Sequence, residues 1–162
     1  MRKLVIILVA IVLCLTGCSN EGTSSAPEQI VKGLNESVEI EASYGNYALT
    51  VKSVTESTKR NDFAETQPKR IVVVEYDYEN IDCTQNITIS HLYFHAYDSE
   101  GNLLDIYPST EVKNSSSISA GGKTSASIAY GLESETNKIK LEFYNVDYSS
   151  MNKPVCTFNL EW

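Results

Sequence analysis

Apolar and polar residues alternate with a period of two along much of the chain. Apolar residues take every second position in 47–51, in 72–78 and in 92–96. Successive side chains of a β-strand point to opposite faces, so this alternation predicts strands with one buried face. The pattern returns in shorter segments, which we expect to be further strands: 103–107, 128–130, 139–143 and 156–160.

The apolar pattern shows no helical repeat, and Gly, Asn, Asp and Ser separate the short strands. Seven or eight such strands predict an all-β fold, and the immunoglobulin-like antiparallel β-sandwich is the commonest arrangement at this size. Strand parity also predicts the core. We expect the following side chains to be buried: Leu49, Val72, Val74, Phe94, Ile128, Leu141 and Phe158.

The N-terminus departs from this pattern. Arg2 and Lys3 precede an almost unbroken apolar run at 4–15, and two small residues then lead to Cys18. This order is typical of a secretory signal peptide, whereas an uncleaved membrane anchor needs about 17 to 25 apolar residues. The tetrad 15–18 resembles the lipobox of bacterial lipoproteins, which implies cleavage before Cys18 and a diacylglycerol on its sulfur. We therefore expect a lipid anchor that holds the protein on the extracytoplasmic face of the cell membrane.

Three parts of the chain are expected. Residues 1–17 are the cleaved signal peptide, and residues 18–37 are the lipidated cysteine followed by a flexible tether, because this stretch is polar and has few apolar residues to pack. Residues 38–162 form the immunoglobulin-like sandwich, long enough for one hydrophobic core.

The charge balance narrows the classes of partner. The chain has 13 Lys and Arg against 21 Asp and Glu, a formal net charge of −8, and loss of the basic residues of the signal peptide makes the mature protein more acidic. Such a surface repels nucleic acid and anionic lipid, so no nucleic-acid partner is expected. An acidic balance is also usual for a soluble extracellular domain.

Several strand and turn segments resemble a known family. The segments 47–54, 71–80 and 94–103 are similar to those of small secreted lipoproteins of Gram-positive bacteria that carry an immunoglobulin-like domain of unknown function. The resemblance extends over about 47–143, although Ala120 stands where the family often has proline. It implies a fold shared with the mycobacterial immunoprotective antigen. The shared motifs mark strand ends and turns, so they imply no catalytic residue.

The connections offer candidate recognition sites. The segment 98–102 contains Gly101 and predicts a hairpin loop, and 120–123 predicts a second turn. Two long polar loops, 56–69 and 109–119, are where we expect a partner to be recognised. A calcium site is the alternative for the first hairpin, but its candidate ligands lack the spacing of an EF-hand: Asp98, Glu100, Asn102 and Asp105.

Two of the four cysteines are available for pairing in the mature domain. Cys14 leaves with the signal peptide and Cys18 is used by the lipid, while Cys83 and Cys156 remain. Outside the cytoplasm these two can form a disulfide. The alternative is two separate thiols, with Cys156 facing the core because it shares the parity of Phe158.

One predicted strand carries a notable set of polar aromatic residues. Alternate positions place His91, Tyr93, His95 and Tyr97 on one face, a candidate binding surface for sugar or peptide. The two imidazoles would stand about 13 Å apart, too far to bind one metal through bonds of about 2 Å. We therefore assign no metal site, and a solvent-facing surface with aromatic cross-strand pairs is the plainer interpretation.

Motifs of common enzymes are absent from the sequence: it has no G-x-S-x-G, no H-E-x-x-H and no phosphate-binding loop. We expect a protein that is not an enzyme and uses no cofactor. The favoured function is an envelope module that binds a protein, peptide or wall polymer through its loops. The alternative is a sensor or chaperone for a small ligand or metal, which a deep pocket with convergent polar groups would favour.

Overall fold

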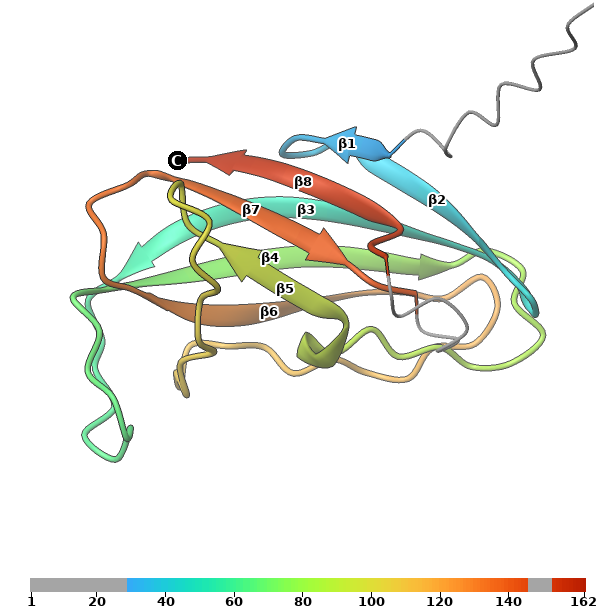
Figure 1. Cartoon of the computed structure of the whole chain (residues 1–162). Helices are drawn as coiled ribbons and strands as arrows, with labels where there is room; N and C mark the ends of the chain where they lie inside the picture. Colours follow the sequence, from blue (N-terminus) through green and yellow to red (C-terminus); the bar gives the residue numbers. More distant parts are fainter. Residues whose placement is uncertain (1–28, 146–152) are drawn as a thin grey trace, which may run out of the picture.

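Two four-stranded sheets stack face to face in the computed structural model, which describes residues 29–145 and 153–162 (Figure 1). The first sheet has the strand order β1-β8-β7-β5 and the second has the order β2-β3-β4-β6. The strands of the first sheet are β1 (Ile30–Lys32), β5 (Phe94–Tyr97), β7 (Lys138–Phe143) and β8 (Cys156–Glu161). Those of the second are β2 (Ser37–Ala42), β3 (Gly45–Ser57), β4 (Arg70–Asn80) and β6 (Lys123–Leu132).

The predicted β-sandwich is confirmed. Neighbouring strands pair antiparallel except β1 and β8, which pair parallel. Among the described residues, no helix is long and apolar enough to span a membrane. All seven side chains predicted for the core are at most 3% exposed, so the strand parity inferred for them holds: Leu49, Val72, Val74, Phe94, Ile128, Leu141 and Phe158.

Aromatic rings join the two sheets across the core. Phe94 of β5 lies with its ring centroid 4.9 Å from that of Tyr76 on β4 and 5.1 Å from that of Phe143 on β7. Tyr76 is buried yet polar, and its hydroxyl donates a hydrogen bond of 2.7 Å to the carbonyl of Ile89. Tilted aromatic pairs at this spacing stabilise a fold beyond the contribution of the apolar surface that they bury. Phe94 is therefore a central contact between the two sheets.

A smaller apolar cluster covers the outer face of the second sheet at one end. Ile71 and Ala129 point away from the main core, and Tyr107 packs over them. The backbone of the 103–107 segment reaches both sheets, because Leu104 donates to the carbonyl of Ala96 while Tyr107 donates to that of Ala129. This segment therefore closes the side of the sandwich between β5 and β6.

The sandwich begins earlier than the predicted boundary at residue 38. Ile30–Lys32 form β1, whose residues pair with Cys156, Thr157 and Phe158, and Gln29 donates a hydrogen bond of 2.8 Å to the hydroxyl of Thr157. Residues 29–37, predicted to belong to the flexible tether, are thus part of the fold. A strand of three residues is too short to show an alternating pattern, and its partner is more than a hundred residues away. Residues 1–28, including Cys18, lie outside the described residues.

One predicted strand starts later than expected, and another is absent as a regular strand. His91–Tyr93 form a 3-10 turn (η1), so the strand predicted over 92–96 starts only at Phe94, and Leu92, expected to face the core, is 69% exposed. The hydroxyl of Ser90 caps the turn by accepting from the amide of Leu92, a local interaction that competes with strand pairing. The segment 103–107 makes only isolated bridges, at Leu103 and Ile106.

The structure shows Cys83 and Cys156 as separate buried thiols, so the possible disulfide is not formed and the alternative of two thiols holds. The sulfur of Cys83, in the loop after β4, contacts the carbonyl of Asn46 at 3.2 Å. Cys156 opens β8 opposite Phe143 and faces the core, as its parity predicted. Burial raises the pKa of the Cys83 thiol and raises that of Cys156 to about 12, so both remain protonated and unreactive at neutral pH.

Candidate functional site

The predicted surface of two histidines and two tyrosines is only half assembled. His91 is exposed on the 3-10 turn, and Tyr93 is half-buried there, packed against the main core. His95 and Tyr97 do share the outer face of β5, as expected. The turn before Phe94 breaks the alternation, so the four side chains do not form one continuous row.

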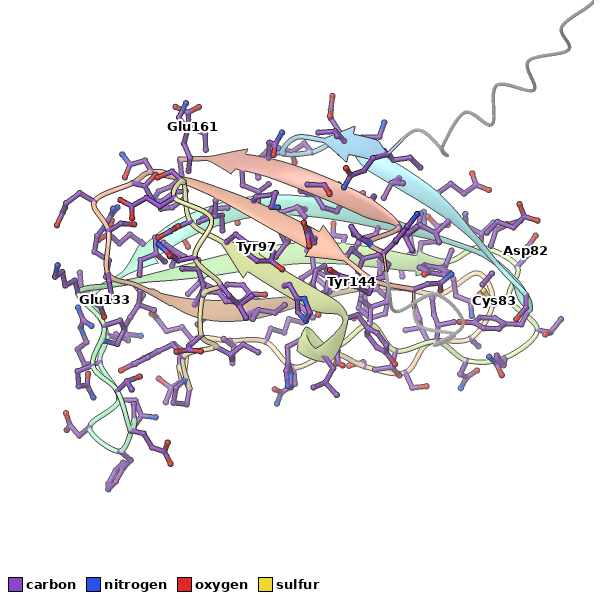
Figure 2. All side chains as sticks on the ribbon, viewed as in Figure 1. Asp82, Cys83, Tyr97, Glu133, Tyr144 and Glu161 are labelled. Carbon is purple, nitrogen blue, oxygen red and sulfur yellow. The ribbon has the colours of Figure 1, made fainter. Side chains whose placement is uncertain are left out.

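His95 and Tyr97 instead contact side chains of β7 and of Tyr144, the residue that follows it. The ring of His95 lies 4.8 Å from that of Tyr144, and the ammonium of Lys140 lies 4.5 Å from the ring centroid of Tyr97. Lys140 also pairs with the carboxylate of Glu142 at 2.8 Å, and the Tyr144 hydroxyl donates to the same carboxylate at 2.9 Å. We call these five residues the β5–β7 face; Figure 2 labels Tyr97 and Tyr144.

The charges of the β5–β7 face neutralise one another. Burial works to raise the pKa of Glu142, but hydrogen bonds from Lys140 and Tyr144 outweigh it and hold the pKa below its ordinary value. Burial, and then the neighbouring Glu142 carboxylate, raise the pKa of Tyr144. The face therefore holds an ionised carboxylate and a neutral phenol that are already bonded to each other.

The loop between β3 and β4 contrasts with this face. It projects from one end of the sandwich (Figure 1, green, lower left). Phe63 within this loop is 95% exposed. The loop was expected over 56–69, but β3 continues to Ser57, so the connecting segment is 58–69. An exposed aromatic ring gains nothing from folding, and it becomes informative where other exposed apolar side chains lie beside it.

Hydrogen bonds fix the shape of this loop. The amide of Asn61 donates to the hydroxyl of Tyr107 at 2.6 Å, and its side-chain amide donates to the carbonyl of Pro108 at 2.7 Å. The Asn61 side chain also accepts from the amide of Phe63 at 2.9 Å. Two carbonyls at the end of the loop, those of Pro68 and Lys69, accept from the guanidinium of Arg60. The loop is therefore braced against the 103–107 segment, and Phe63 projects from an ordered support.

A glycine on β6 allows the loop to pack this closely. Pro68 is buried, and a Cβ atom placed on Gly131 would lie 2.9 Å from its side chain. Carbon atoms do not approach to this distance without displacement, so a side chain at 131 would push the end of the loop away from the sheet. Gly131 thus helps to set the position of the loop.

Two adjoining hollows lie between the loop and the 103–107 segment. One has a volume of about 310 Å³ and is bordered by Pro68 and Leu103, and the other, of about 600 Å³, is bordered by Phe63 and Pro108. Thr66, Asp105 and Ile106 line both. We call these two hollows together the loop-end groove. Its apolar members Leu103 and Ile106 are 58% and 48% exposed.

The loop-end groove is acidic. The described residues that line its two hollows include four carboxylates and no Lys or Arg; the carboxylates are Glu65, Asp98, Asp105 and Glu133. Figure 2 shows Glu133 at this end of the molecule and Cys83 at the opposite end. The groove therefore combines exposed apolar side chains with negative charge.

Asp98 also stabilises the turn in which it lies. Its carboxylate accepts hydrogen bonds of 2.9 Å from the amides of Glu100 and Asn102. These bonds outweigh burial, which acts in the opposite direction, and hold the pKa of Asp98 below its ordinary value. The predicted hairpin at 98–102 is thus present, with Gly101 at a positive φ of 85°. No cluster of three or more metal-binding side chains occurs in the described part of the chain.

Only part of this groove is predictable from the sequence. The loop was expected to recognise a partner, but Phe63 was not singled out, and Leu103 and Ile106 were assigned to a strand. The available signal was a lone aromatic residue within a polar loop. The proximity of 63 and 106 depends on tertiary contacts that no local pattern records.

Comparisons with known proteins agree with this fold. The secreted protein MPT63 of Mycobacterium tuberculosis has a similar structure, with a TM-score of 0.64 and 11% identity over 85% of this chain and 100% of that one. The yjhA protein of Bacillus subtilis is also similar, with a TM-score of 0.51 and 14% identity over 80% of this chain and 98% of that one. A search of curated protein sequences finds no match.

The family match extends over most of the sandwich. Residues 24–145 match the model of a domain of unknown function, DUF5067. The match begins close to β1 and ends close to the end of β7, so it includes the loop-end groove and the whole β5–β7 face. The chain belongs to the DUF5067 family.

Proposed function

We propose that this chain is an extracytoplasmic lipoprotein whose sandwich domain binds another component of the cell envelope, without catalysis, through the loop-end groove. The observation that carries the proposal is Phe63, which is 95% exposed on a loop held in place by hydrogen bonds. Exposed aromatic anchors beside a groove are characteristic of binding surfaces.

The topology supports an outward orientation of this groove. The chain enters the sandwich at Ile30, which pairs with Cys156, and Cys156 lies opposite Phe143. Phe143 contacts Tyr47 near the start of β3, whereas the Phe63 loop follows the end of β3. A strand of 13 residues spans about 40 Å. A lipid at Cys18 therefore attaches to the domain at the end opposite the groove, which leaves the groove accessible to partners away from the attachment point.

The anchor has its own test in a Cys18→Ala variant. Stable membrane attachment of a lipoprotein needs its acyl chains, so the variant is expected in the medium or as the unprocessed precursor. Cell fractionation and the mass of the mature N-terminus measure this. A variant that is still cleaved and still partitions with membranes would contradict the lipid anchor.

The binding site is tested on intact cells by photo-crosslinking. A benzophenone side chain in place of Phe63 keeps an aromatic group in the groove, and the same group in place of Ile81 provides a matched control. Ile81 is 37% exposed in the loop after β4, at the opposite end of the domain. We expect a discrete adduct from position 63 and little from position 81. Equal adducts from both positions, or none from position 63, would contradict the proposed site.

A further inference from the structure

The groove has features that specify the chemistry of its occupant. We infer that the loop-end groove binds an extended cationic peptide segment in which basic and apolar side chains alternate, an inference that rests on the proposed function. Three properties of the described residues support it: the exposed apolar side chains, the sign of the surrounding charge and the hydrogen-bonded backbone of one wall.

The apolar side chains provide contact area that folding leaves uncovered. Phe63 stands on the loop side, while Leu103 and Ile106 come from the 103–107 segment on the other side. These three are 95%, 58% and 48% exposed, respectively. A partner that places apolar side chains between the two sides removes this surface from water, which favours binding by about 25 cal/mol per Å² buried before entropic costs.

The charges around these side chains have one sign. Asp105 borders both hollows, Glu65 borders the hollow beside Phe63, and Glu133 borders the other. The loop carries three cations, Lys59, Arg60 and Lys69, and none of them lines either hollow. Lys59 pairs with Glu111 at 3.0 Å, and Arg60 donates to the backbone of its own loop. The field over the groove therefore attracts Lys and Arg side chains and repels phosphate and carboxylate groups.

The shape of the groove suits an extended chain. One wall of the groove is the 103–107 segment, whose backbone is hydrogen-bonded to β5 at Ala96 and to β6 at Ala129, so this wall is held in place before a ligand binds. Successive side chains of an extended peptide point to opposite faces, and neighbouring side chains on the same face lie about 7 Å apart. Apolar residues of such a peptide can therefore face the groove while basic residues reach its acidic rim.

A lipid surface is the other class of ligand that exposed aromatic residues can contact. The tethered end of the sandwich lies opposite Phe63, and the carboxylates of the groove oppose anionic headgroups. Both observations favour peptide over lipid. The binding experiment below separates the two.

The experiment uses the full mature chain in nanodiscs of zwitterionic lipid, with empty nanodiscs as the blank. Fluorescence anisotropy follows three labelled octapeptides with alternating Lys and Leu, alternating Lys and Ser, and alternating Glu and Leu. We expect the Lys-Leu peptide to bind at least about tenfold more tightly than the other two. Its affinity falls as salt is added, because screening weakens the charged contacts.

Variants locate the binding. Phe63→Ser combined with Ile106→Ser is expected to weaken the Lys-Leu peptide at least about tenfold, and Asp105→Asn to weaken it by about threefold. Matched controls are Ile81→Ser, an exposed apolar residue at the opposite end, and Glu39→Gln, an exposed acid on β2. Both controls are expected to bind as the unchanged protein does, and thermal unfolding verifies that every variant is folded.

Three outcomes would overturn the inference: no binding of the Lys-Leu peptide, equal binding of all three peptides, or equal losses in the control variants. Crosslinking of benzophenone at position 63 to nanodisc lipid would assign the groove to a membrane surface instead. The proposed function fails separately, if position 63 gives no adduct on intact cells. An adduct on cells without peptide binding would leave that function standing and refute the peptide chemistry.

Discussion

The β5–β7 face and the loop-end groove are both rich in aromatic and charged side chains, but they differ in how those side chains are satisfied. On the β5–β7 face, Glu142 is bonded to Lys140 and Tyr144, and Tyr97 lies against Lys140. In the loop-end groove, Phe63 is exposed and the carboxylates at the rim have no lining cation among the described residues. A surface whose charged and polar groups already bond to one another gains little binding free energy from a partner. The groove, in contrast, gains both burial of apolar surface and neutralisation of its charge.

The largest expected effect separates an aromatic ring in the core from one in the groove. Phe94→Ala removes contacts with Tyr76 and Phe143 and leaves a cavity, so we expect it to lower the free energy of unfolding by about 3–5 kcal/mol. Urea denaturation measures this cost. A loss below about 1 kcal/mol would contradict the central place given to Phe94 in the core.

The next effect concerns the support of the loop. Gly131→Ala places a Cβ 2.9 Å from Pro68, so we expect a cost of about 1–3 kcal/mol and weaker crosslinking from position 63. Lys52→Ala, an exposed change on β3, is the control and should alter stability by less than about 0.5 kcal/mol. Equal stability of the two variants would show that the loop does not depend on this close approach.

The β5–β7 face predicts a dependence on pH. The pKa of Glu142 is lower in the folded protein than its ordinary value of 4.5, so its ionised form contributes stability above the unfolded-state pKa. That contribution is lost as the pH falls through the folded-state pKa. Glu142→Gln is therefore expected to cost about 1 kcal/mol at pH 7, with the difference from the unchanged protein shrinking below about pH 4.5. A difference that stays constant down to pH 3 would contradict the ionised network.

The smallest expected effect on stability belongs to the groove itself. Phe63 is 95% exposed, so Phe63→Ala should change the free energy of unfolding by less than about 0.5 kcal/mol. The same variant should bind its partner markedly less well. A destabilisation similar to that of Phe94→Ala would show that Phe63 packs against the domain and is not offered to a partner.

The sequence predicted elements whose alternation is long and uninterrupted. The second sheet follows from the periodicity of 47–51 and 72–78, because each segment repeats its pattern over several residues. Prediction failed where a local hydrogen bond interrupts a strand, and where a strand pairs with a segment far away in the sequence. Ser90 turns the chain at 91–93, and β1 takes its partner from the far end of the sequence.

The candidate site was predictable only in part for the same reason. A polar loop between two strands predicted that recognition occurs there, and this remains a prediction. The groove exists because Asn61 and Tyr107 join segments that are distant in sequence, and because Gly131 leaves room for Pro68. Neither contact has a periodic signature, so only the tertiary structure places Phe63 beside Ile106.

Cysteine labelling on intact cells compares the two surfaces most directly. Thr66→Cys places a thiol in the loop-end groove and His95→Cys places one on the β5–β7 face; both positions are exposed. Cys83 and Cys156 are buried with raised thiol pKa values, so they do not compete for a membrane-impermeant maleimide. We predict that position 66 labels several-fold more slowly on cells than in the purified protein, while position 95 labels equally in both. Equal labelling of position 66 in the two settings, or protection of position 95 alone, would contradict the assignment of binding to the groove.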